Sequence, residues 1–215
     1  MQTFKNNDGK IILLKIVKAI QDNKAYLGEV DGLIGDGDHG MNMNKGFTLF
    51  ADRFSAEDFS FSQGLDYLGT ILFSEIGGSM GPIYGTIMMD AAEAGEELSE
   101  ISVADLAAML SAGLAGLEDI VDARVGDKTL VDTLGPAVES LKASAKAGES
   151  FEIALPKMKT VAKTGRDSTK ELVAKYGRSA RLGERSRGVL DAGAVSCCLI
   201  LTSMADGILE LVTKG

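Results

Sequence analysis

The chain has 215 residues, of which 45% are hydrophobic and 25% are charged, and this composition is typical of a folded globular protein rather than a disordered or fibrous one. A formal net charge of −9 disfavours a nucleic-acid-binding protein, because such proteins normally present a basic surface. The longest apolar stretch, 192–201, is shorter than the roughly 18 residues of a membrane helix, and the N-terminus has no apolar secretory core. We therefore expect a cytoplasmic protein that binds neither nucleic acid nor a membrane.

The spacing of apolar residues is mostly helical, and the chain has only three prolines and no sustained two-residue alternation. This pattern predicts an all-α protein, and the lack of repeats and low-complexity linkers predicts a single domain over residues 1–215. The last helix is apolar almost all round, so we expect it at the centre of the helix bundle. Eight helices are predicted, over residues 8–28, 41–53, 60–76, 81–95, 102–123, 129–147, 150–175 and 191–212.

Acidic residues gather in the first glycine-rich segment, which we expect to be a loop. Asp31, Asp36 and Asp38 lie there, and no lysine or arginine occurs from residue 25 to residue 44. Two like charges about 4 Å apart repel by roughly 1 kcal/mol in water and by about 4 kcal/mol at an effective dielectric constant of 20. A hard divalent cation removes this repulsion, and oxygen ligands favour Mg²⁺, Mn²⁺ or Ca²⁺ over zinc. The three aspartates are therefore candidate metal ligands, the alternative being a solvated acidic turn that caps the next helix.

Two familiar loop motifs fit this segment poorly. An EF-hand that starts at Asp36 would need a glutamate at its twelfth position, where the sequence has Phe47. The run 35–40 has the glycine spacing of a dinucleotide-binding loop, but the segment before it has a helical pattern rather than that of a strand. A helix start predicted near Gly40 and Met41 would offer free backbone N–H groups to a phosphate. A metal site next to a helix start indicates a nucleotide whose phosphates are bound through a metal ion.

Three further glycine-rich segments each precede a predicted helix. The segment 77–85 either lets an anion approach the backbone or forms a tight interhelical turn. The segment 126–132 either offers Lys128 to phosphate and Leu130 to a purine ring or caps its helix. The segment 177–188 holds four arginines, which either clamp phosphate or pair with surface carboxylates.

The single histidine, His39, lies inside the acidic segment. The neighbouring carboxylate oxygens already suit a hard ion, which favours a hydrogen bond from His39 to phosphate over metal ligation.

Taken together, these segments resemble the nucleotide-binding L subunit of dihydroxyacetone kinases. The resemblance rests on the run Ile34-Gly-Asp-Gly-Asp-His-Gly-Met-Asn-Met-Asn-Lys-Gly46-Phe47, on Gly-Asp-Lys-Thr at 126–129 and on Leu-Gly-Glu-Arg-Ser at 182–186. These motifs are distributed from the first predicted helix to the last, so the resemblance covers essentially the whole sequence.

The resemblance implies an eight-helix antiparallel up-and-down barrel with a nucleotide site at one end. It implies that Asp31, Asp36 and Asp38 hold two Mg²⁺ ions against the phosphates of ADP or ATP, and that Arg178 takes part in catalysis with them. The residues that it implies as nucleotide contacts are His39, Gly40, Met41, Asn42, Ser79, Met80, Gly126, Leu130, Arg178, Asp191, Ala192 and Gly193. Two of these positions depart from the family pattern, because Met80 follows Ser79 where a hydroxyl is usual and Ala192 stands where proline is usual.

The resemblance also implies partner proteins. The sequence is too short for a separate sugar-binding domain, so we expect a K subunit to hold dihydroxyacetone and a phosphotransferase-system protein to recharge the bound ADP. A homodimer is compatible with this interpretation. The alternatives are the same fold phosphorylating another short ketose or an acyl group with ATP, or a non-catalytic ADP-sensing module that binds a regulator.

Overall fold

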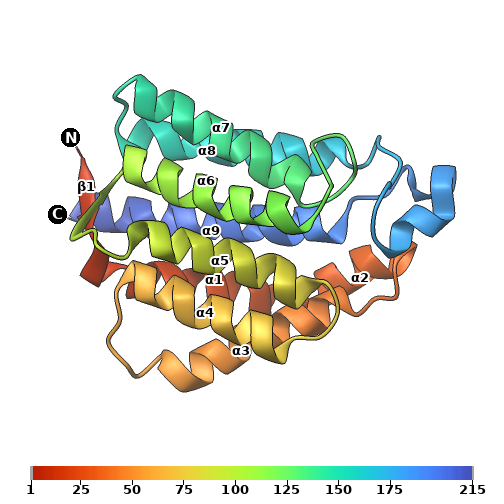
Figure 1. Cartoon of the computed structure of the whole chain (residues 1–215), viewed down its shortest axis with the longest axis horizontal. Helices are drawn as coiled ribbons and strands as arrows, with labels where there is room; N and C mark the ends of the chain where they lie inside the picture. Colours follow the sequence, from red (N-terminus) through yellow and green to blue (C-terminus); the bar gives the residue numbers. More distant parts are fainter. Residues whose placement is uncertain (1, 215) are drawn as a thin grey trace.

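The computed structural model describes residues 2–214, and these residues form nine α-helices, two short strands and two 3-10 helices. The α-helices lie side by side along the long axis of the molecule (Figure 1). Their bounds are α1 Lys10–Asp22, α2 Lys24–Ile34, α3 His39–Phe54, α4 Phe61–Glu75, α5 Met80–Gly95, α6 Val103–Ile120, α7 Val131–Lys146, α8 Phe151–Ser168 and α9 Ala192–Lys214. The strands are β1 Thr3–Lys5 and β2 Glu100–Ser102, and the 3-10 helices are η1 Asn6–Asp8 and η2 Arg178–Ser186.

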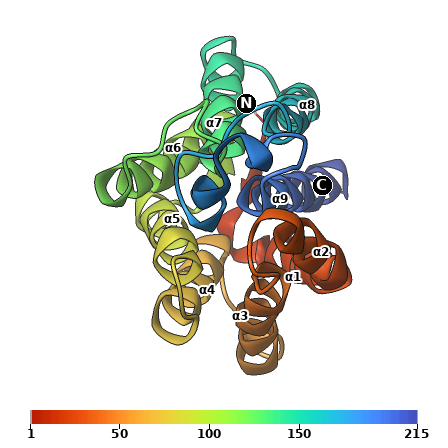
Figure 2. The ribbon, with the colours of Figure 1, turned by 90° about the vertical axis from the view of Figure 1, so that its right-hand side faces the viewer.

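Eight of the helices in the described residues form a closed ring. Each packs against the next in the order α1, α3, α4, α5, α6, α7, α8 and α9, and α9 packs against α1 to close the ring. The end-on view shows these helices around a common axis (Figure 2). Phenylalanine, isoleucine and leucine side chains with no exposed surface fill the interior, among them Phe47, Phe61 and Phe151. The all-α, up-and-down barrel that the resemblance implies is therefore confirmed.

The first predicted helix, 8–28, is wrong as a single element, because the helix breaks at Asn23. The Asn23 side chain donates a hydrogen bond to the carbonyl oxygen of Ala19 at 2.8 Å, and its backbone leaves the helical region with φ −103° and ψ 10°. Asparagine side chains compete in this way with the regular helical hydrogen bonds. A second helix, α2, then runs to Ile34, so Asp31 lies in a helix and not in the expected loop.

The two strands form an antiparallel ribbon that the sequence pattern did not predict. Phe4 of β1 pairs with Ile101 of β2, and both side chains are buried. Strands of three residues are too short to show a two-residue alternation. The Phe4 ring also packs edge-on against Phe61, with centroids 5.7 Å apart, so the ribbon helps to close the end of the barrel near the N-terminus.

The last helix does not lie at the barrel centre, as its apolar sequence predicted. α9 forms part of the wall, where it packs against α1 and α8 (Figure 2). Among the described residues it is the one helix long and apolar enough to cross a membrane, but 56% of the apolar window is buried inside the protein. Packing against neighbouring helices therefore accounts for its apolar surface.

The predicted helix 150–175 ends early. α8 stops at Ser168 and carries Pro156 in its second turn without a break, and the segment that follows contains η2. Gly165 lies where α8 meets α7, and a Cβ there would overlap the carbonyl oxygen of Asp132. The two helices approach closely because this position has no side chain.

Candidate functional site

Four helices of the ring begin at the same end of the barrel, which is the right-hand end in Figure 1. The first residues of α3, α5, α7 and α9 are His39, Met80, Val131 and Ala192, and all four line one cavity of about 710 Å³. Helix N-termini present free backbone N–H groups and the positive end of the helix dipole. This end of the barrel therefore suits an anionic ligand.

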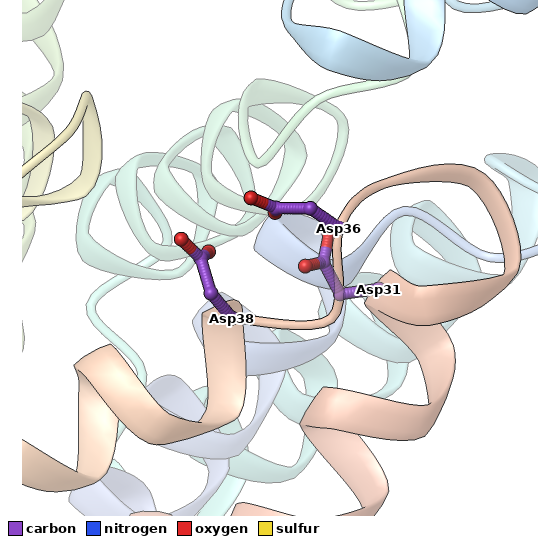
Figure 3. Close-up of side chains that lie close together, drawn as sticks. All are labelled: Asp31, Asp36 and Asp38. Atoms are coloured by element: carbon purple, nitrogen blue, oxygen red, sulfur yellow. The ribbon is translucent and has the colours of Figure 1, made fainter.

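The three predicted metal ligands come together at the edge of this cavity. Asp31 lies in the last turn of α2, Asp36 in the loop after it and Asp38 directly before α3. Each offers a carboxylate oxygen within 4.8 Å of the other two, and Figure 3 shows the three side chains around a common space. The loop turns sharply at Gly37, whose φ of +76° is a conformation that glycine adopts readily. Three hard oxygen donors at this spacing fit a divalent cation such as Mg²⁺.

A cationic side chain from a distant segment faces the same carboxylates. Arg178, the first residue of η2, forms an ion pair with Asp36, and its guanidinium nitrogen lies 3.9 Å from Asp38. The Arg178 side chain is about half exposed, so the contribution of this pair to stability is small. Its place beside the cavity leaves the guanidinium available to a phosphate group.

His39 is buried at the start of α3, with its imidazole directed into the protein. Its Nε2 lies 2.8 Å from the hydroxyl oxygen of Ser196, and its backbone N–H donates a hydrogen bond to Asp31 at 3.3 Å. Burial lowers the pKa of His39 to about 4, although the negative charge of Asp31 acts in the opposite direction. The imidazole is therefore neutral at physiological pH and can either donate or accept a hydrogen bond.

Asp191 occupies the N-cap of α9 and accepts a hydrogen bond from the backbone N–H of Ala194 at 2.7 Å. Burial raises the pKa of this carboxyl to about 6, and the bond from Ala194 opposes that shift. Asp191 thus fixes the first turn of α9 at the cavity wall.

Most of the predicted nucleotide contacts line the cavity, and three do not. A Cβ at Gly40 would overlap the carbonyl oxygen of Lys24, so this glycine serves the close approach of α3 to α2. The Met41 side chain is exposed on the outside of α3. The Gly126 N–H donates a hydrogen bond to Asp132 at 2.6 Å and is therefore already paired. The predicted residues that line the cavity are Asp31, Asp36, Asp38, His39, Asn42, Ser79, Met80, Leu130, Arg178, Asp191, Ala192 and Gly193.

Lys128 lines the cavity, but its ammonium group is already bonded to the protein. The side chain is 1% exposed and donates hydrogen bonds to the carbonyl oxygens of Thr169 and Val189. Burial lowers the pKa of Lys128, and the nearby Asp191 partly offsets the effect. Lys128 therefore ties the segment before α7 to the end of α8 and to the approach to α9, rather than offering its charge directly to phosphate as the sequence suggested.

Sequence reasoning missed two hydroxyl residues behind the cavity, Tyr84 of α5 and Ser196 of α9. Their oxygens lie 2.6 Å apart, and both side chains are buried. Tyr84 lies in the glycine-rich segment 77–85, but that motif gave the tyrosine no role, and Ser196 belongs to no charged or glycine-rich motif. The one signal available was a tyrosine and a serine on otherwise apolar helix faces, which indicates a buried polar pair but not its partners.

Comparison with known proteins gives a consistent likeness. A sequence profile for the DAK2 domain matches residues 33–206. The protein is 36% identical over 183 residues to the ADP-binding subunit DhaL of the PEP-dependent dihydroxyacetone kinase of Escherichia coli (strain K12), over 84% of this sequence and 86% of that one. It is 31% identical over 193 residues to the ADP-binding subunit DhaL of the PTS-dependent dihydroxyacetone kinase of Lactococcus lactis, over 89% of this sequence and 92% of that one.

The fold also matches a solved structure, the dihydroxyacetone kinase of C. freundii in complex with AMP-PNP and Mg²⁺, with a TM-score of 0.71 and 22% identity. The match extends over 92% of this protein but 33% of that longer one. At this identity the likeness establishes the shared fold alone.

Proposed function

Since the protein belongs to the DAK2 domain family and matches ADP-binding DhaL subunits along most of their length, we propose that it is the nucleotide-binding subunit of a cytoplasmic dihydroxyacetone-type kinase. The observation that carries this proposal is the convergence of Asp31, Asp36 and Asp38 at an end of the barrel where four helices begin. Carboxylates attract cations, and helix N-termini attract anions. A metal-bound polyphosphate carries both kinds of charge and therefore fits this end of the barrel.

In this proposal the three aspartates hold two Mg²⁺ ions, the number that the family resemblance implies. Bound there, Mg²⁺ would neutralise phosphate charge during phosphoryl transfer. Asp36 and Asp38 are the more accessible ligands, because Asp31 is anchored in α2 and already accepts a bond from the His39 backbone. In this proposal the carboxylates therefore position the terminal phosphate group at the open edge of the cavity.

The phosphates of ADP or ATP lie, in this proposal, against the first turn of α3 and beside Arg178. His39 and Asn42 face the cavity from that turn, and both can form hydrogen bonds to phosphate oxygens. Arg178 approaches from η2 beside Asp36, and its guanidinium matches the geometry of a phosphate group. These residues position and neutralise the transferred group, which is the main task of a protein in phosphoryl transfer.

The nucleoside lies, in this proposal, deeper in the cavity, between α5, α7 and α9. Leu130 offers an apolar face to a purine ring, and Ala192 and Gly193 lie next to Leu130 in the same wall. The turn at Ser79 and Met80 borders the same space. Ala192 is small, so the absence of the proline that is usual in the family leaves this wall intact.

A second protein has to supply the acceptor in this proposal. The relatives that the protein matches along most of their length are named as ADP-binding subunits, and in this proposal a separate K subunit holds dihydroxyacetone. Two exposed apolar side chains that border the cavity, those of Ile120 and Tyr176, give such a partner a surface to bind. A phosphotransferase-system protein then recharges the bound ADP, as the PTS-dependent name of the Lactococcus lactis relative suggests.

Reconstitution tests this function. The protein is mixed with its K subunit and dihydroxyacetone, and either ATP or phosphotransferase components with phosphoenolpyruvate are added. We expect dihydroxyacetone phosphate only in the phosphotransferase mixture, and native mass spectrometry should find ADP and Mg²⁺ retained on the purified protein. Product with ATP alone would favour ATP as the substrate, and product with another short ketose would change the acceptor. ADP binding without any product would instead support a nucleotide-sensing module.

A further inference from the structure

A buried pair of hydroxyl groups connects three of the helices that border the cavity. The Tyr84 hydroxyl of α5 and the Ser196 hydroxyl of α9 lie 2.6 Å apart, and their side chains are 2% and 0% exposed. On one side of the pair, the Ser196 oxygen lies 2.8 Å from Nε2 of His39 in α3. On the other side, the Tyr84 hydroxyl donates to the carbonyl oxygen of Gly193 at 3.0 Å.

The pair therefore joins two residues at the cavity wall that come from different parts of the sequence. His39 begins α3, whose first turn faces the acidic loop, and Gly193 belongs to the first turn of α9. The Ser196 oxygen also lies 3.1 Å from the Gly193 carbonyl oxygen, so both hydroxyls converge on that one backbone group. Buried hydrogen-bond networks of this kind restrict the side chains that they connect.

The hydrogen bonds of His39 determine which ring nitrogen a ligand can reach. Nε2 is taken by Ser196, while within residues 2–214 no side chain or backbone group forms a hydrogen bond with Nδ1. The imidazole borders the cavity. Nδ1 is thus the nitrogen that remains for a ligand in the cavity.

We infer that Tyr84 and Ser196 are positioning residues for nucleotide binding, which hold the His39 imidazole with Nδ1 toward the phosphates and hold Gly193 in the nucleoside wall. This inference rests on the proposed nucleotide function of the same cavity. The hydroxyls themselves act through His39 and Gly193, in the way that residues behind a binding site fix the groups that touch the ligand.

Ser196→Ala removes the partner of Nε2, and Ser62→Ala is its matched control. Ser62 is also a buried serine with hydrogen bonds to a side chain and to a backbone carbonyl, but its partners are Asn6 and Gly95, away from the cavity. Both substitutions delete one buried hydroxyl, so both should lower thermal stability. In calorimetric titrations with ADP and Mg²⁺, Ser196→Ala should weaken binding about tenfold, whereas Ser62→Ala should leave it unchanged.

Nuclear magnetic resonance gives a readout that a purely structural role would not change. His39 is the single histidine, so the imidazole nitrogen signals of the protein belong to it. These signals should shift in Ser196→Ala, shift less in Tyr84→Phe and stay in place in Ser62→Ala. Tyr84→Phe keeps the ring that fills the core, so it provides a well-folded second variant with weaker ADP binding.

The decisive measurement combines two substitutions. If Ser196 acts through His39, adding Ser196→Ala to a His39→Ala variant should cause no further loss of ADP affinity. Wild-type affinity in both Ser196→Ala and Tyr84→Phe, or an equal loss in Ser62→Ala, would overturn the inference while the nucleotide function stands. A wild-type protein that binds no ADP with Mg²⁺ would overturn the proposed function and this inference together.

Discussion

The guanidinium of Arg178 forms an ion pair with the carboxylate of Asp36, and so joins η2 to the loop between α2 and α3. These two residues bring the basic and the acidic segments of the sequence to the same edge of the cavity. Charges of both signs at one place suit a ligand that itself combines a metal cation with phosphate groups.

Asp36→Asn should abolish Mg²⁺-dependent nucleotide binding and leave the helical circular dichroism spectrum near that of the wild type. The substitution deletes one of three converging carboxylates but disturbs no helix, because Asp36 lies in the loop. ADP titrations with and without Mg²⁺ measure the effect. The matched control is Asp22→Asn, which changes the net charge equally at an exposed residue paired with Lys18. Normal nucleotide binding by Asp36→Asn would mean that the carboxylates hold no metal.

Lys128 stabilises the cavity wall through its ammonium group and at the same time occupies an unfavourable backbone conformation. Its φ of +62° is the one positive value at a non-glycine residue among residues 2–214. Lys128→Met should reduce the free energy of unfolding by about 2–3 kcal/mol, because two buried carbonyl oxygens lose their donor. Lys128→Gly should cost more than Lys128→Met, because loss of the buried four-carbon stem leaves a cavity whose cost exceeds the strain that glycine relieves at this φ. Urea denaturation measures both.

An exposed lysine provides the control for this pair of variants. Lys142 forms a salt bridge with Glu139 on the surface of α7, and Lys142→Met should change stability by less than about 0.5 kcal/mol. Equal stabilities for Lys128→Met and the wild type would show that the ammonium bonds contribute nothing to the fold.

Much of this architecture could be predicted from the sequence, because it depends on local patterns. The 3.6-residue spacing of apolar side chains gives the helices, and the Ser102 capping box with Asp105 marks the start of α6 as expected. The mutual repulsion of Asp31, Asp36 and Asp38 indicated that a cation brings them together, and the structure places them within 4.8 Å.

The remaining features depend on contacts between distant segments. The break at Asn23 follows from a side-chain hydrogen bond that competes with the hydrogen bonds of the helix. Because asparagine does not break every helix in which it occurs, the sequence pattern alone did not predict this break. The role of Lys128 depends on the backbone of Thr169 and Val189, which only folding brings near. The same holds for Tyr84 and Ser196, whose partners lie on other helices.

Gly165→Ala should destabilise the protein by about 2 kcal/mol or more. The added methyl group would overlap the carbonyl oxygen of Asp132, which is backbone and cannot rotate away, so α8 would have to move from α7. Thermal unfolding monitored by circular dichroism measures the loss. Gly32→Ala is the control, because the nearest atom to its Cβ would be Cα of Gly37 at 3.9 Å. In α2 this second substitution should stabilise the helix slightly, as alanine has the higher helix propensity. Equal effects of both substitutions would contradict the close packing at Gly165.

The buried carboxyl of Asp191 should make the protein more stable in mild acid. Its pKa is raised from an ordinary value of 3.8 to about 6, mainly by burial; the negative charges of Asp132 and Asp31 add to the shift, and Lys128 opposes it. Between about pH 4 and pH 6 the folded protein therefore binds a proton that the unfolded protein does not. By linkage, this group adds up to about 2–3 kcal/mol to the free energy of unfolding as pH falls through that range, and the gain is lost again above pH 6.

Asp191→Asn isolates this contribution. The amide oxygen can still cap α9 by accepting from the Ala194 N–H, but residue 191 carries no charge above pH 6. We expect the variant to be more stable than the wild type at pH 8 by about 1–2 kcal/mol, less than the full amount because Lys128 loses a nearby negative charge. Urea denaturation in EDTA, without nucleotide, at pH 4, 6 and 8 measures this difference. Two stability curves that stay parallel from pH 4 to pH 8 would show that folding does not raise the pKa of the Asp191 carboxyl.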